Sequence, residues 1–146
     1  MHELFKIVLT ASFTLIGGVV LLVITQILTR FIVDPLVDFR RLLGEVGHTL
    51  VFYSNYFYNA SVMASKPEFQ EATRQCRTLA SRLRSFSNAV PLYATLARLR
   101  LVPPHADVYK ASAALIDLSN TTSSHPFDVV NQHYERISKL LDIRVD

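Results

Sequence analysis

The sequence predicts an all-α protein in which one N-terminal transmembrane helix precedes a cytoplasmic bundle of four or five helices. Three observations predict this fold class. Residues 7–28 contain no charged side chain, the apolar residues after them recur at alternating spacings of three and four, and no stretch alternates with the period of two that marks a strand. We assign residues 1–33 to a membrane anchor and residues 34–146 to the bundle.

The uncharged segment, residues 7–28, has the length of a membrane-spanning helix. At about 1.5 Å of rise per residue it would extend roughly 33 Å, and the hydrocarbon core of a bilayer is about 30 Å thick. A cleaved secretory signal has a shorter apolar run and ends in small residues, whereas this segment continues into Thr29-Arg30-Phe31. We therefore expect an uncleaved membrane helix, with a buried core helix as the alternative.

Basic residues around this span predict its orientation. Lys6 precedes it, with Glu3 nearby, and Arg30, Arg40 and Arg41 follow it. Because the cytoplasmic flanks of membrane helices carry the excess of lysine and arginine, we expect the N-terminus outside and the bundle in the cytoplasm. A single cysteine suits a reducing compartment. Two Asn-x-Ser/Thr sequons point the other way, and we interpret them as accidental.

Turn and cap signals bound the helices of the predicted bundle. Asp34-Pro35 is a helix start, and because the residue before a proline avoids the α region, we expect a break or kink near Val33. Residues 59–66 are predicted to form a loop, and Pro91 and Pro103-Pro104 are predicted to end helices. The expected helices begin near residues 34, 67, 92, 106 and 126.

Two of these helices carry an unbroken heptad seam, a pattern that buries one stripe of a helix against its partners. In the first helix the seam consists of Leu36, Phe39, Leu43, Val46, Leu50, Tyr53 and Phe57. In the second helix it consists of Phe69, Ala72, Cys76, Leu79, Leu83, Phe86 and Val90. We expect these residues to form the core, together with shorter apolar stripes on the last two helices.

The run DPLVDFRRLLGEVGHTLVFYSNYFYN, residues 34–59, and the apolar and turn positions between Leu79 and Asn120 carry a family resemblance. The chain resembles a group of small bacterial proteins that have one N-terminal membrane span and a cytoplasmic helical domain, without an assigned activity. The resemblance covers most of the chain. It implies a bacterial inner-membrane protein, and it transfers no catalytic or binding residue.

Small residues follow one face of the expected membrane helix. In lipid, such residues let two helices approach closely, and hydroxyl groups bond across the interface. We expect self-association through this face, and a pore lined by the same threonines and Gln26 is the alternative. The residues of this stripe are Thr10, Thr14, Gly17, Gly18 and Thr25.

A local excess of arginine marks the middle of the chain. Between Ala72 and Ala106 there are six arginines and no acidic residue. A solvated helix face is the simplest interpretation, and contact with anionic lipid or an acidic partner is the sharper one. Nucleic acid is not expected, because the net charge is only +3 and no aromatic residue lies between Arg74 and Arg84. The candidate anion contacts are Arg74, Arg77, Arg82 and Arg84.

Aromatic residues are dense between Phe52 and Tyr58. They exceed what a single core seam needs, and tyrosine suits interfaces because it offers both apolar area and a hydroxyl group. Packing within the core is the first interpretation, and a subunit interface is the second. The candidate interface residues are Tyr53, Tyr56 and Tyr58.

Residue patterns typical of catalysis are weak in this sequence. Glu45-x-x-His48 has the spacing of a di-iron motif, but such sites need two of these motifs and two further carboxylates, and the two residues flank the seam at Val46. Cys76 occupies a core position, where a free cysteine behaves as a small apolar residue. No phosphate-binding loop or nucleophile elbow occurs. We therefore expect no metal, no cofactor and no catalytic residue.

The function expected from these features is binding. We expect a single-pass membrane-anchored interaction, scaffold or regulatory protein, present as a homo-oligomer or as a subunit of a membrane complex. Membrane lipid is an expected partner. The alternative is a homo-oligomeric channel formed by the single span. An enzyme of unknown type is the third and least favoured hypothesis, so we expect no enzymatic activity.

Overall fold

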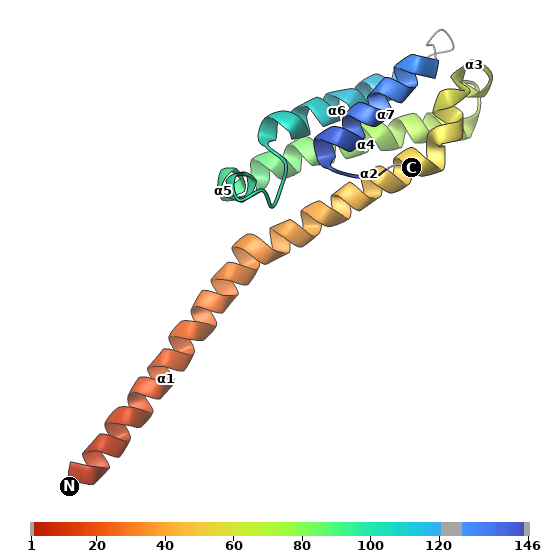
Figure 1. Ribbon diagram of the computed structural model, residues 1–146. Coiled ribbons are helices and arrows are strands. Elements are labelled where there is room, and N and C mark those ends of the chain that lie inside the picture. The colour runs from red at the N-terminus through yellow and green to blue at the C-terminus, as the bar shows by residue number, and fades with distance from the viewer. Residues whose placement is uncertain (1, 121–126, 145–146) are drawn as a thin grey trace. The chain divides into compact units, whose positions relative to one another are not determined.

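The computed structural model describes residues 2–120 and 127–144, and every regular element within them is a helix. The all-α prediction is therefore confirmed. The chain divides into two compact units, Met1–Pro35 and Leu36–Asp146. In chain order (Figure 1) the elements are α1 His2–Leu28, the π-helical turn η1 Thr29–Val33, α2 Asp34–Tyr58, α3 Ala60–Met63, α4 Pro67–Ala89, α5 Tyr93–Arg98, α6 His105–Ser119 and α7 Phe127–Leu141.

Helix α1 is apolar and exposes each of its side chains from Glu3 onward. Leu4, Phe13 and Leu15 have exposed fractions of 69%, 70% and 71%. This helix near the N-terminus is long and apolar enough to cross a membrane. Because removing apolar surface from water is favourable, a helix that is apolar all round belongs in a protein core or in a bilayer.

The backbone near Val33, where the sequence predicts a break or kink, does not leave the helical region. The residue before the proline, Asp34, has φ −59° and ψ −50°, and its N–H donates to the carbonyl of Thr29. Proline lacks an N–H group, and its ring crowds the carbonyl four residues earlier. A π-helical turn is wider than an α-helical one, so η1 accommodates Pro35 without ending the helix. The expected departure of Asp34 from the α region was wrong, whereas the α-helix is interrupted near Val33, as predicted, by the π-helical turn η1.

The second unit is built around the close approach of α4 to α6, with α7 packed on α6 (Figure 1). Small buried residues permit this approach, among them Ala72 and Ala80 on α4 and Ala111 on α6. The Oγ of Ser112 on α6 donates a 2.9 Å hydrogen bond to the carbonyl of Ala80. This bond satisfies a hydroxyl group that is fully buried, which would otherwise carry a desolvation cost.

Helix α2 contacts the other helices through large side chains. The ring centroids of Phe39 on α2 and Phe86 on α4 lie 5.1 Å apart. The hydroxyl of Tyr134 on α7 donates a 3.0 Å hydrogen bond to the carbonyl of Leu50. These aromatic rings fill the space between α2 and its neighbours, so α2 contributes both apolar packing and a buried polar contact to the core.

The buried stripe of α2 differs from the predicted seam. Leu42 and Thr49 are buried, whereas the predicted Leu36, Leu43 and Tyr53 are only half-buried. A straight α-helix drifts about 20° per heptad relative to a strict seven-residue pattern. Helix α2 also packs against both α4 and α7, and its buried stripe is therefore broader than a two-helix seam. On α4 the prediction was more accurate, since only two seam residues are half-buried, Phe86 and Val90.

The predicted loop over residues 59–66 contains the one-turn helix α3. The carbonyl of Asn59 accepts hydrogen bonds from the N–H groups of Val62 and Met63, at 3.0 and 2.9 Å. The Asn59 side chain donates through Nδ2 to the carbonyl of Asn55, at 3.0 Å. Asn59 thus joins the end of α2 to the start of α3, and the prediction of a loop was wrong for this turn.

The shifted stripe on α2 yields a matched pair of substitutions. Leu42→Ala should lower the free energy of unfolding by about 2–4 kcal/mol, because Leu42 has an exposed fraction of only 4% and its removal leaves a cavity. Leu43→Ala should cost clearly less, because Leu43 is half-buried. Urea unfolding of the full chain in detergent, followed by circular dichroism, measures both. A larger loss for Leu43→Ala would favour the heptad seam over the packing described above.

Candidate functional site

A groove of about 720 Å³ lies at one end of the second unit. Its walls come from three places in the sequence: the first turns of α2, the end of α5 with the segment that follows it, and the end of α7. Three arginines line it, Arg40, Arg98 and Arg100, together with the single carboxylate of Asp142. The apolar part of its lining includes Leu43, Leu101 and Leu140.

The segment that forms one wall is held by side chains buried in the bundle. Tyr93, Leu96 and Val102 have exposed fractions of 3%, 2% and 5%. Burial raises the pKa of Tyr93 to about 12, so its hydroxyl stays protonated and donates a 2.8 Å hydrogen bond to the carbonyl of Pro103. The Tyr93 ring also lies 4.3 Å from that of His105, centroid to centroid. The wall is therefore fixed to the bundle at both ends of α5.

The end of α5 forms a Schellman motif with an arginine at its left-handed position. Arg100 has φ 58°. Its N–H donates to the carbonyl of Ala97, and the N–H of Leu101 donates to the carbonyl of Leu96, both at 3.0 Å. Glycine usually occupies this position, because a side chain disfavours positive φ. A positively charged side chain is thus held at a place where the backbone alone would favour glycine.

The end of α7 also places a left-handed residue in the groove lining. Asp142 has φ 53°, and the N–H of Ile143 donates a 3.1 Å hydrogen bond to the carbonyl of Ser138. Leu92, just before α5, also has positive φ, at 61°. These three are the only non-glycine residues with positive φ in the described part of the chain, and two of them line the groove. Such concentrations are typical of functional positions.

The electrostatic character of the groove is basic. Arg40, Arg98 and Arg100 are exposed, and none of their guanidinium groups has an ion pair or hydrogen bond to another described residue. The groove carries one carboxylate against these three cations. Its lining therefore combines unpaired positive charge with apolar surface, which suits an anionic and partly apolar ligand or surface.

The arginines selected from the sequence, in contrast, have partners within the bundle. Arg74 pairs with Glu71 at 2.6 Å, and Arg82 pairs with Glu45. Hydrogen bonds from Gln75 and Arg74 hold the pKa of Glu71 below its ordinary value. That these arginines contact an anion stays a prediction.

Arg77 and Arg84 share a smaller hollow of about 350 Å³ on α4, which the other two selected arginines do not line. Arg77 donates to the side chains of Ser119 and Asn120, at 3.1 and 2.8 Å. The guanidinium carbon of Arg84 lies 5.6 Å from the ring centroid of Tyr109. The structure thus brings together two of the four selected arginines and gives each an internal contact.

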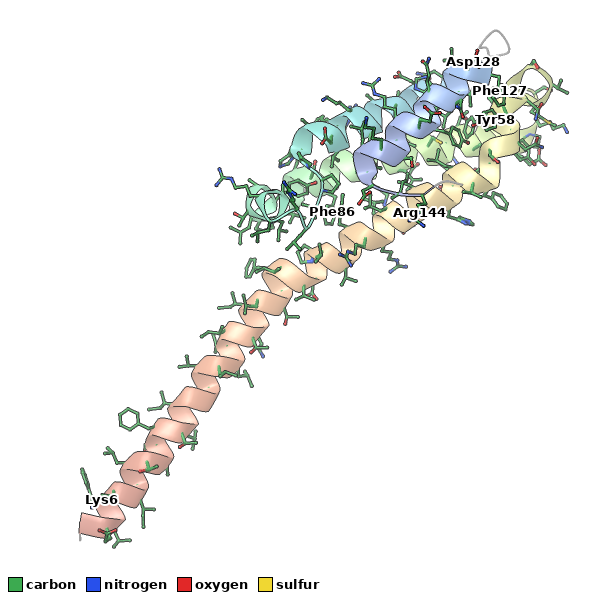
Figure 2. All side chains as sticks on the ribbon, viewed as in Figure 1. Lys6, Tyr58, Phe86, Phe127, Asp128 and Arg144 are labelled. Carbon is green, nitrogen blue, oxygen red and sulfur yellow. The ribbon has the colours of Figure 1, made fainter. Side chains whose placement is uncertain are left out.

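The three candidate interface tyrosines have different surroundings. The Tyr58 ring stacks on that of Phe127 at 4.7 Å (Figure 2) and lies 5.3 Å from that of Tyr134, centroid to centroid. Its hydroxyl donates a 3.2 Å hydrogen bond to Asn131 Oδ1. Burial and the Glu135 carboxylate raise its pKa. Tyr53 and Tyr56 are half-buried, and the neighbouring Phe52 has an exposed fraction of 62%. The exposed aromatic surface is therefore centred on Phe52, and an interface there stays a prediction.

The threonine hydroxyls in the small-residue stripe on α1 all form hydrogen bonds within their own helix. The hydroxyls of Thr10, Thr14 and Thr25 donate to the carbonyls four residues before them, at 2.8–2.9 Å. A Cβ added at Gly17 or Gly18 would meet no atom within 4 Å. Both glycines therefore leave open space on the helix surface, where another helix could approach closely.

Residues with catalytic chemistry do not converge in the part of the chain that the structure describes. Glu45 pairs with Arg82, while the His48 ring stacks on Phe52 at 5.6 Å. No three His, Cys, Asp or Glu side chains among the described residues are arranged to hold a metal ion. Cys76 is fully buried on α4.

Comparisons with known proteins add no family. No protein-family model matches the sequence, and neither a curated protein nor a solved structure matches the chain.

The predictions from the sequence did not include the basic groove, although the run LARLRL, residues 96–101, carries a signal for it. Its leucines at 96, 99 and 101 share no single helical face with the spacing of a buried stripe, so some of them must be exposed, next to the arginines.

Burial of Cys76 predicts a thiol that is inert in the folded chain. Its pKa is raised to about 12, so almost no thiolate, the reactive species, forms near pH 8. Iodoacetamide should label the thiol only after unfolding, and alkylation kinetics with and without denaturant measure this. Because burial raises the pKa of the Cys76 thiol in the folded chain, the buried neutral thiol stabilises the fold fully at pH values below the ordinary pKa of about 8.5. This stabilisation is lost as the pH rises toward 12. Rapid labelling of the folded protein at pH 8 would contradict the buried position.

Proposed function

We propose that this chain is a single-pass protein of the bacterial inner membrane whose cytoplasmic helical bundle acts by binding. One observation carries the proposal: α1 exposes apolar side chains along its length, while the second unit buries a core of its own. A helix of this kind is stable in a bilayer, where all its backbone groups are paired internally. The bundle then supplies the surfaces that meet partners, and the basic groove is the first candidate among them.

The orientation in this proposal places the bundle in the cytoplasm. Arg30 lies directly after the uncharged segment, and Arg40 and Arg41 follow within the first turns of α2. Only Lys6 precedes the segment, and Glu3 lies 3.5 Å from its Nζ. The basic excess therefore follows the span, which favours retention of that side in the cytoplasm.

The proposal includes self-association through the stripe on α1. Gly17 and Gly18 leave the helix surface open, and van der Waals packing drives helix association in lipid when small residues let backbones approach. The threonine hydroxyls already donate to backbone carbonyls of the same helix. Because these hydroxyls have partners within their own helix, they do not specifically favour a pore lined by threonine. We therefore propose a scaffold rather than a channel.

Membrane insertion and orientation can be tested together in a bacterial host. The full chain should stay with the membrane fraction after an alkaline wash. A thiol introduced by Val62→Cys should react with a membrane-impermeant maleimide only after the membrane is permeabilised. Val62 is a suitable site because its exposed fraction is 70%, and Cys76 does not compete because it is buried.

Glu3→Cys provides the matched control for orientation, because Glu3 precedes the span and its side chain is exposed. Its thiol should be labelled without permeabilisation. The reverse pattern at the two positions would place the bundle outside the cell. Release of the chain by the alkaline wash would contradict the membrane anchor.

Self-association is tested by the mass of the full chain in detergent, measured by light scattering. Gly18→Leu should shift the distribution toward monomer, because a leucine side chain separates the two helix backbones. Gly44→Leu is the matched control, since a Cβ added at Gly44 on α2 also meets no atom within 4 Å. A monomeric wild-type chain, or equal effects of both substitutions, would contradict association through α1.

A further inference from the structure

Exposed leucines and unpaired arginines occur together around α5. Leu92, Leu99 and Leu101 have exposed fractions of 57%, 64% and 39%. Arg98 and Arg100 alternate with the last two of these leucines in the sequence. Single exposed leucines are common on protein surfaces, but three within ten residues, interleaved with cations, form a patch that water solvates poorly. We refer to these five residues and Arg40 as the α5 corner.

The backbone of the α5 corner keeps these side chains on the surface. Leu92 and Arg100 bracket α5, and both have positive φ, at 61° and 58°. Pro91 lies between the end of α4 and Leu92, so α4 cannot continue and the chain turns outward at this point. The anchors Tyr93 and Leu96 meanwhile hold the other face of α5 in the core. The corner is therefore a fixed surface of the bundle.

We propose that the α5 corner binds the anionic surface of the bilayer in which the chain is anchored. Arginine pairs with phosphate oxygens through its fork of donors, and leucines next to such cations enter the boundary between headgroups and acyl chains. The groove at Arg40, Arg98 and Arg100 then faces the lipid phosphates, and Leu92, Leu99 and Leu101 lose their contact with water.

The charge and the apolar surface of the α5 corner together favour an anionic lipid surface over a second copy of the chain or a nucleic acid. A second copy of the chain would bring the same arginines face to face in a symmetric contact, which like-charge repulsion disfavours. A nucleic acid would pair with the arginines but leave the leucines in water. An anionic lipid surface meets both groups at once. The cytoplasmic leaflet is negatively charged, which attracts basic residues within about a Debye length of it.

This inference rests on the proposed membrane anchor. Arg40 follows the end of the uncharged segment by twelve residues, so even a fully extended chain would keep it within roughly 43 Å of that end. The tether thus holds the bundle at a high effective concentration near the lipid surface, and weak contacts are sufficient for binding.

The test uses the full chain in vesicles and exploits the absence of tryptophan from the sequence. Leu99→Trp introduces a single indole at the α5 corner. The chain is reconstituted into vesicles of phosphatidylcholine alone or of an equimolar mixture with phosphatidylglycerol, each with and without brominated acyl chains. Tryptophan fluorescence should be quenched by bromine and shifted to shorter wavelength in the anionic vesicles, and much less in phosphatidylcholine. The two leaflets have the same composition, so either orientation of insertion gives the result.

Val62→Trp is the matched control for position, because Val62 has an exposed fraction of 70%, against 64% for Leu99, but lies on α3. Its fluorescence should stay unquenched in both vesicles. In the Leu99→Trp chain, Arg98→Glu with Arg100→Glu should abolish the quenching. Arg136→Glu with Lys139→Glu makes the same change of charge on exposed residues of α7 and should preserve it. Equal thermal unfolding by circular dichroism establishes that each variant is folded.

The outcomes separate this inference from the membrane anchor. If the chain floats with the vesicles while the indole at position 99 remains unquenched in the anionic ones, the lipid contact is overturned and an acidic protein becomes the better occupant. Equal quenching in both kinds of vesicle overturns the role of anionic lipid. A chain that fails to float with either vesicle contradicts the anchor itself, whatever the fluorescence.

Discussion

The close packing of α4 against α6 is the constraint on which the rest of the bundle depends. Alanines at the contact let the two backbones approach, and the hydrogen bond from Ser112 to the Ala80 carbonyl fixes how they are aligned along their axes. The two helices run in opposite directions (Figure 1), so the segment that joins them has to turn at one end of the bundle. That segment contains α5, and its exposed residues are therefore a consequence of the central packing.

Aromatic side chains then determine how α2 covers this centre. Phe39 meets both Phe86 and the Tyr93 ring, at 5.1 and 6.4 Å. The same residue lies in the groove lining. Core packing and the candidate site consequently share a side chain, which couples the position of Arg40, one residue further on, to the position of α5. This coupling gives the groove a defined shape although its walls come from distant parts of the sequence.

Helix positions followed from the sequence because their signals are local. A proline at its first position predicted the start of α4, and a spacing of three and four predicted most of the buried residues of that helix. Leu42 and Thr49 escaped prediction because burial on α2 depends on two partner helices, which no local pattern describes. The groove was missed for the same reason, since Arg40, Arg100 and Asp142 are remote in sequence and meet only through packing. The four arginines chosen from the sequence all lie on α4, where their proximity was visible. The partners of Arg82 and Arg77, which are Glu45 and Ser119, lie on other helices and were not visible.

The left-handed backbone at Arg100 has a consequence for how the chain can be altered. Glycine adopts this conformation without a steric penalty, so Arg100→Gly should make the fold more stable while removing one cation from the groove. Stability and surface charge thus have opposite optima at a single position. Selection for thermal resistance alone would tend to erase the arginine, whereas selection for the basic surface would keep it. The identity of residue 100 among variants of this chain therefore reports which of the two requirements dominates.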